Sequence, residues 1–118
     1  MQEIGAIRDW HAHVYFDPAT RMAAAALREG VGARFPQAVL GRWHEEPVGP
    51  HPRSMYQIAF TKDDFPALVS FVALNRAGLT VLVHPNTARP KDDHLKHALW
   101  MGSVLSLDAG MLPEVAKE

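Results

Sequence analysis

The side chains best suited to chemistry in this 118-residue sequence are its seven histidines. Two of them, His11 and His13, form a His-x-His pair inside the segment DWHAHVYF. On an extended strand their imidazoles project from one face about 6.6 Å apart, so both could reach one metal ion. Neutral imidazole binds Fe, Zn, Cu and Ni, and it also exchanges protons near neutral pH. The pair therefore indicates a metal site or an acid–base site.

Further histidines come from separate segments. His84 follows an apolar run, His51 lies in a proline-rich loop, and His94 and His97 are three residues apart, on one face of a predicted helix. Taken singly, each has a local alternative: His84 could bond the backbone of the turn that follows it, and His51 could be an exposed loop residue. His44, next to two glutamates, is interpreted as a solvated loop residue. Convergence of several segments favours the metal or acid–base interpretation.

An α+β arrangement is predicted to position these residues. Strands are predicted over residues 9–16, 38–43, 55–60 and 79–83. A first helix, capped by Asp17-Pro18, is predicted over 22–29 and ended by Gly30 and Gly32. The remaining predicted elements are a helix from Asp63 or Asp64 to Ala77-Gly78, a turn at residues 84–87 and a third helix over about 91–105.

The order βαββαβ predicts a ferredoxin-like fold with a four-stranded antiparallel sheet in the order 4-1-3-2, plus a C-terminal helix. The length predicts a single domain over residues 1–118, with a mobile tail over about 107–118. Both crossover helices should then pack on one face of the sheet.

The two faces of the predicted sheet differ in chemistry. The apolar set Trp10, Ala12, Val14 and Phe16 is assigned to the helix-covered face. The other face receives His11, His13, Tyr15, Met55, Gln57, Ala59, Thr80, Leu82 and His84. This open face must meet a partner chain, the third helix or a ligand. A two-fold homodimer is expected to complete it, and a monomer closed by its own third helix and tail is the alternative.

Composition excludes several function classes. Twelve Lys and Arg balance 13 Asp and Glu, giving a net charge of −1, which argues against binding to nucleic acid or to an acidic membrane surface. No apolar run approaches the length of a membrane helix, and no signal peptide is recognised. The absence of cysteine excludes disulfides and thiolate chemistry and fits a cytoplasmic location.

Four histidine-containing blocks of the chain resemble the DOPA 4,5-dioxygenase family. They are WHAHVYFD (10–17), VGPHPRSMYQIAF (48–60), NRAGLTVLVHPNT (75–87) and DHLKHALWMG (93–102). The resemblance covers about residues 8–105. It implies a ferredoxin-like fold and an extradiol dioxygenase that opens a catechol ring, such as that of a DOPA-like compound. It also implies non-haem Fe(II) as cofactor, O₂ as co-substrate, and Zn as a possible substitute metal in purified protein.

The resemblance also implies roles for individual residues. The expected metal ligands are His13, His51 and His84, because the iron must keep positions open for the catechol oxygens and for O₂. The expected acid–base residues are His11 and His94, and Tyr15 is expected to bond a substrate oxygen. The expected substrate-binding residues are Gln57, Arg53 and Arg89.

Two questions stay open at this point. Extradiol sites usually combine two histidines with one carboxylate, but no Asp or Glu falls on the predicted open face. The site could use three histidines, a loop carboxylate such as Asp93 could reach in, or the chemistry could be lost in this chain. The alternative function is a non-catalytic ferredoxin-like dimer that binds a ligand or structural zinc.

Overall fold

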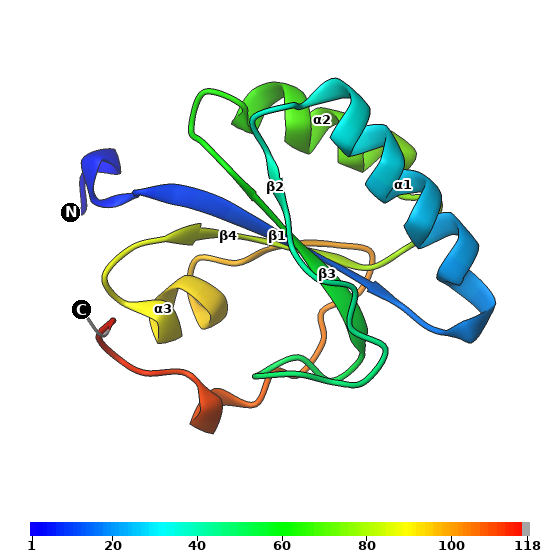
Figure 1. Cartoon of the computed structure of the whole chain (residues 1–118). Helices are drawn as coiled ribbons and strands as arrows, with labels where there is room; N and C mark the ends of the chain where they lie inside the picture. The colour runs from blue at the N-terminus through cyan, green and yellow to red at the C-terminus, as the bar shows by residue number, and fades with distance from the viewer. Residues whose placement is uncertain (117–118) are drawn as a thin grey trace.

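Five antiparallel strands form the sheet of the computed structural model, which describes residues 1–116 (Figure 1). The strands are β1 (Asp9–Phe16), β2 (Val39–Leu40), β3 (Ser54–Phe60), β4 (Val81–Asn86) and β5 (Leu99–Met101). Their order across the sheet is β2-β3-β1-β4-β5. The predicted α+β class is confirmed, but the predicted four-stranded sheet is wrong, because β5 adds a fifth strand beyond β4.

Helices lie on both sides of this sheet. The α-helices are α1 (Arg21–Arg34), α2 (Phe65–Asn75) and α3 (Pro90–Leu95), and three single-turn 3₁₀ helices are η1 (Ile4–Ala6), η2 (Pro18–Thr20) and η3 (Ala109–Met111). Figure 1 shows α1 and α2 over one face of the sheet, and α3 with the chain after β5 over the other. The topology therefore departs from a simple ferredoxin-like fold in having a covered second face.

The alternation along β1 separates two cores. Ala12, Val14 and Phe16 belong to the large apolar cluster beneath α1 and α2. Tyr15 belongs to a second, smaller cluster on the opposite face, with Met55 and Leu82. The predicted assignment of the β1 side chains to the two faces is confirmed, because side chains of a strand alternate with a period of two residues.

The predicted cap Asp17-Pro18 lies on η2, the 3₁₀ turn that leads directly into α1, whereas α1 itself begins at Arg21 and ends later than predicted. The Asp17 carboxylate accepts a bond from the Thr20 backbone N–H at 3.0 Å, and Pro18 occupies the first turn. The helix continues through Gly30 and Gly32 to Arg34. A Cβ at Gly30 would lie 3.1 Å from the Phe71 ring, so this glycine permits close packing of α1 on α2. Tertiary packing thus outweighs the low helix propensity of glycine.

The chain after residue 83 is where local prediction fails most. Residues 84–86 of the predicted turn over 84–87 are instead the end of β4, which includes Pro85. The pairing of β4 with β5 reaches only as far as Val83, opposite Leu99, so in the described sheet Pro85 pairs with β1 alone. A residue without a backbone N–H is tolerated at such a position on the edge of a sheet. The predicted helix over 91–105 is also wrong: α3 ends at Leu95, and residues 99–101 pair with the β4 edge, whose backbone groups need partners.

The second face of the sheet is covered by the chain itself. Its apolar cluster packs against Ala98, Trp100, Leu105 and Leu107. The backbone N–H of Asp108 donates to the carbonyl of Pro50, and that of Lys91 donates to Pro113. The reason for expecting a homodimer, an uncovered face, therefore does not hold, and the homodimer stays a prediction. So does a mobile tail over 107–118, of which residues 117 and 118 lie outside the described part.

Within residues 1–116, the longest apolar helix is too short to cross a membrane.

Candidate metal centre

Five histidines meet on the face of the sheet opposite α1 and α2. They are His11 and His13 from β1, His84 from β4, His51 from the loop before β3, and His94 from α3. His11 and His84 are direct partners in the β1–β4 register. The His84 and His94 ring centroids lie 3.9 Å apart, and those of His13 and His51 lie 4.2 Å apart. The predicted convergence of separate segments on one region is therefore present.

Two triads in this cluster have the spacing of a metal site. One is His11, His13 and His84, and the other is His13, His51 and His94. In each triad, one donor nitrogen per ring lies within 4.8 Å of the others. His13 is common to both. Over residues 1–116, the groups with this spacing contain histidine alone and no carboxylate.

The hydrogen bonds of His13 and His84 define their tautomers. His84 Nδ1 lies 2.8 Å from the carbonyl oxygen of Pro85, which can only accept, so Nδ1 carries the proton. In neutral His84, Nε2 is then an acceptor, and it lies 3.0 Å from His13 Nε2. The proton between the two rings therefore belongs to His13 Nε2. His84 therefore bonds the backbone of the residue that follows it, as the local alternative predicted, and it also belongs to the cluster.

His94 and His51 are oriented in the same way by groups outside the cluster. His94 Nδ1 donates to the Pro90 carbonyl at 2.7 Å, which leaves Nε2 without a proton. Tyr15 Oη lies 2.6 Å from His51 Nδ1, and when this Nδ1–H donates to the hydroxyl, His51 Nε2 is free as well. Metal-binding histidines in proteins characteristically have such a partner on the other ring nitrogen.

Within residues 1–116, one nitrogen of the cluster is both buried and without a hydrogen-bond partner. His13 Nδ1 is buried and makes no hydrogen bond. A buried polar atom without a partner costs free energy, on the order of 1–3 kcal/mol. Because His13 Nε2 holds the proton shared with His84, Nδ1 has a free lone pair. A metal ion bound here would satisfy it, so the donor set fits a metal that prefers imidazole.

Burial keeps the cluster neutral. Desolvation holds the pKa of His13 well below its ordinary value, and the neighbouring His51 and His84 lower this pKa further. Desolvation likewise lowers the pKa of His51 to about 4 and that of His84 to about 3. The pKa values of His11 and His94 are lowered too, again mainly by burial. At neutral pH these imidazoles are unprotonated on one nitrogen, as a metal ligand must be.

The other predicted site residues are placed differently. Tyr15 is buried, and its hydroxyl contacts His51. Gln57 is half-buried and pairs with His13 across β1 and β3, beside the cluster. Arg53 is exposed. Arg89 is exposed as well and forms an ion pair with Asp92 at 3.4 Å. The roles predicted for these residues stay predictions.

The question of a carboxylate ligand has a structural answer in Asp93. This side chain is fully buried on α3, but both of its oxygens accept bonds from Thr87. Sequence reasoning considered Asp93 and missed its partner Thr87, because a contact between residues six apart across a chain reversal has no periodic signal. Of the remaining histidines, His44 bridges Met55 through its backbone, and His97 lines a separate groove with Trp10, Pro85 and Leu99.

Fold and site together define a small α+β protein with a histidine-only candidate metal centre on one face of its sheet. The chain belongs to the Dopa 4,5-dioxygenase family, whose model matches residues 10–111. It is 36% identical over 103 residues to an uncharacterized 21.2 kDa protein of Botryotinia fuckeliana, covering 80% of this chain and 56% of that protein. The family resemblance of the four histidine-containing blocks is thereby confirmed.

Two further relatives carry a dioxygenase description. The chain is 34% identical over 115 residues to the DOPA 4,5-dioxygenase of Amanita muscaria, covering 91% of this chain and 50% of that protein. A crystal structure of a candidate dioxygenase from Nostoc punctiforme is similar with a TM-score of 0.92 and 47% identity, covering 94% of this chain and 96% of that one. The chain thus spans about half the length of the curated relatives, and nearly the full length of the solved one.

Proposed function

We propose that this protein is an extradiol dioxygenase that opens the ring of a catechol, such as a DOPA-like compound, with O₂ at a histidine-bound Fe(II). The observation that carries the proposal is the cluster of five neutral, mutually close imidazoles in a chain of the Dopa 4,5-dioxygenase family. The name of the Amanita muscaria relative supplies the substrate class. A bound Fe(II) would supply the redox chemistry that brings O₂ and the catechol together.

For the ligands we favour His13, His51 and His94. Each of these rings has one nitrogen bonded to a protein group: His13 to His84, His51 to Tyr15, and His94 to the Pro90 carbonyl. Each has its other nitrogen free for a metal. The resemblance predicts a different ligand set, His13, His51 and His84. These three residues do not all belong to one triad, and His84 is already the hydrogen-bond partner of His13.

Of the two remaining histidines, His11 suits proton transfer. His11 is half-buried, makes no side-chain hydrogen bond in the described structure, and lies 5.3 Å from His84 between ring centroids. A neutral imidazole can accept a catechol proton and return it during ring opening. We assign this role to His11. His84 donates its Nδ1–H to the Pro85 carbonyl and accepts the hydrogen bond from His13 Nε2, so we assign it the role of orienting the His13 ring. Gln57 pairs with His13 in the β1–β3 register, which supports the proposal that it bonds the substrate.

Metal analysis and a catechol assay test the proposal together. The untagged protein, loaded with Fe(II) without oxygen and then exposed to air and a catechol, should form a yellow ring-opened semialdehyde. His51→Ala and His94→Ala should lose the metal, whereas His11→Ala should keep it and lose about 10²- to 10⁴-fold in turnover. Stoichiometric zinc without turnover would favour the non-catalytic alternative. Metal loss in His11→Ala and His84→Ala alone would move the site to the other triad.

A further inference from the structure

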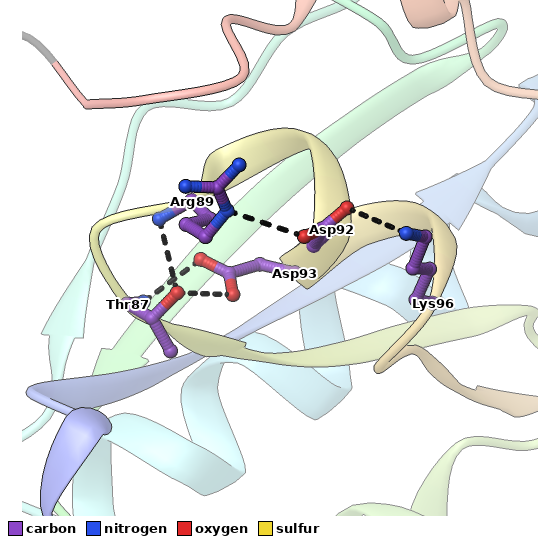
Figure 2. A network of polar contacts seen from close by, with 5 residues as sticks. All are labelled: Thr87, Arg89, Asp92, Asp93 and Lys96. Carbon is purple, nitrogen blue, oxygen red and sulfur yellow. Dashed lines mark hydrogen bonds and ion pairs between the residues drawn. The ribbon is translucent and has the colours of Figure 1, made fainter. Parts of the chain in front are cut away.

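Within residues 1–116, the buried carboxylate of Asp93 pairs with no cationic side chain. Asp93 is 0% exposed. Its neighbour Asp92, on the outer side of α3, pairs with Arg89 and Lys96 instead, and Figure 2 shows the two aspartates serving separate partners. An ionised group buried without a counter-charge is costly unless hydrogen bonds satisfy it. Asp93 is instead held by neutral hydrogen-bond donors. The presence of a buried carboxylate at this position therefore needs an explanation other than charge pairing.

In the described part of the chain, those donors belong to Thr87. Its backbone N–H donates to Asp93 Oδ2 at 2.8 Å, and its hydroxyl donates to Oδ1 at 2.6 Å. The Thr87 oxygen in turn accepts from the Arg89 backbone N–H at 3.0 Å (Figure 2). Thr87 directly follows β4, and Asp93 lies in the middle of α3. The contact therefore ties the short helix to the end of the strand.

His94 lies on the helix that this contact ties to β4. The helix α3 has six residues, too few to be stable by itself in water. His94 follows Asp93 directly, and its ring is bonded to the Pro90 carbonyl in the same helix. Ring and helix therefore move as one unit. The ring of His84, on β4, lies 3.9 Å from that of His94, so a shift of α3 against β4 would change the distance between the two rings.

We infer that Asp93 is a positioning residue, whose bonds to Thr87 lock α3 against β4 and so hold His94 in the histidine cluster. As a role toward a metal site, the inference rests on the proposed function, but the placement of His94 can be measured without metal. Partners outside the direct ligands typically contribute 10- to 100-fold to metal affinity. Thr87 and Asp93 would form that outer layer for a site that has no carboxylate ligand of its own.

The test is NMR of the metal-free protein with labelled histidine rings, followed by Co²⁺ titration. In the wild type, ring protons of His84 and His94 should give a nuclear Overhauser cross peak. Thr87→Val removes the hydroxyl but keeps the shape and the backbone N–H bond to Asp93, so it should weaken this peak and weaken Co²⁺ binding about 10-fold. Thr87→Ser, which keeps the hydroxyl, should retain both. Asp92→Asn is the matched control on the same helix and should also retain both.

Unchanged cross peak and Co²⁺ affinity in Thr87→Val would overturn the inference. Weaker Co²⁺ binding in Thr87→Val with an unchanged cross peak between His84 and His94 would contradict action through His94. Asp93→Asn replaces Thr87→Val should that variant not fold. Failure of both to fold, with Thr87→Ser folded, would assign the contact to the fold and overturn the inference. A wild type that binds no Co²⁺ would refute the proposed function, while the cross peaks would still decide the placement of His94.

Discussion

The two faces of the central sheet bury side chains of different chemistry, and the burial has different consequences on each face. On the face beneath α1 and α2, residues such as Val14, Ile58 and Val81 are fully buried and apolar, so each contributes to folding stability. On the other face, the same strands bury His13 and His84. Desolvation lowers the pKa of both, which means that burial disfavours their charged forms. Burying these imidazoles costs stability but keeps them neutral and oriented. We call the face beneath α1 and α2 the stabilising face, and the face with the histidines the chemical face.

Removing His13 should have the largest effect on the chemical face. The His13→Ala variant should lose bound metal, because His13 belongs to both triads and a missing ligand costs several kcal/mol of a binding energy on the order of 10. Metal analysis of the purified variant measures this. His44→Ala, a half-buried histidine outside the cluster, should keep full metal. Full metal in the His13→Ala protein would remove the cluster from consideration as the metal centre.

Truncating a residue of the stabilising face should give the opposite pattern. Ile58 is fully buried beneath the helices. The Ile58→Ala variant should lose about 2–5 kcal/mol of unfolding free energy through lost burial and cavity formation, yet keep its metal stoichiometry. Urea denaturation and metal analysis test both parts. Should metal be lost in the folded variant, the two faces would be coupled and the contrast between them would not hold.

The pH dependence of stability should come from the chemical face. The folded pKa values of His51 and His84, about 4 and about 3, lie below the ordinary 6.5, so protons bind the unfolded chain more tightly. The contribution to stability is therefore full above pH 6.5 and is lost as the pH falls towards those values. For the metal-free protein we expect a loss of about 2 kcal/mol per group between pH 7 and pH 5.

Denaturation curves at several pH values distinguish the two faces. The His84→Gln substitution should flatten the dependence on pH. By contrast, Ile58→Ala should lower stability by the same amount at every pH. A wild-type stability that does not change between pH 7 and pH 5 would contradict the burial of these imidazoles.

The smallest effect is expected from the hydroxyl that supports His51. The Tyr15→Phe variant keeps the ring stacked on Trp100 but loses the 2.6 Å contact to His51 Nδ1. Metal affinity should fall about 10-fold and unfolding free energy by about 1 kcal/mol. Isothermal titration and urea denaturation provide the two numbers. A loss of turnover with unchanged metal affinity would instead support the substrate-bonding role first expected for Tyr15.

Part of the fold and of the candidate site was predictable from the local sequence pattern. The alternation over DWHAHVYF is sufficient to assign His11 and His13 to one face and Val14 to the other. Successive side chains of a strand point to opposite faces of the sheet, so neighbouring positions fall on different faces. The region after residue 83 was not predictable in this way. Residues 91–105 have enough apolar and acidic positions to suggest one helix, but three of them pair with β4 instead. The free edge of a strand distant in sequence decides that choice, and no local window contains it.

By itself, the sequence determined the composition of each sheet face and the family, since both follow from residue identity and short-range spacing. The tertiary structure alone decided which rings share a triad, which nitrogen of each ring is free, and that the Asp93 carboxylate bonds Thr87. These depend on distances of a few ångströms between segments far apart in the chain. Hydrogen bonds and desolvation vary steeply over such distances, whereas the hydrophobic patterning that a sequence displays does not.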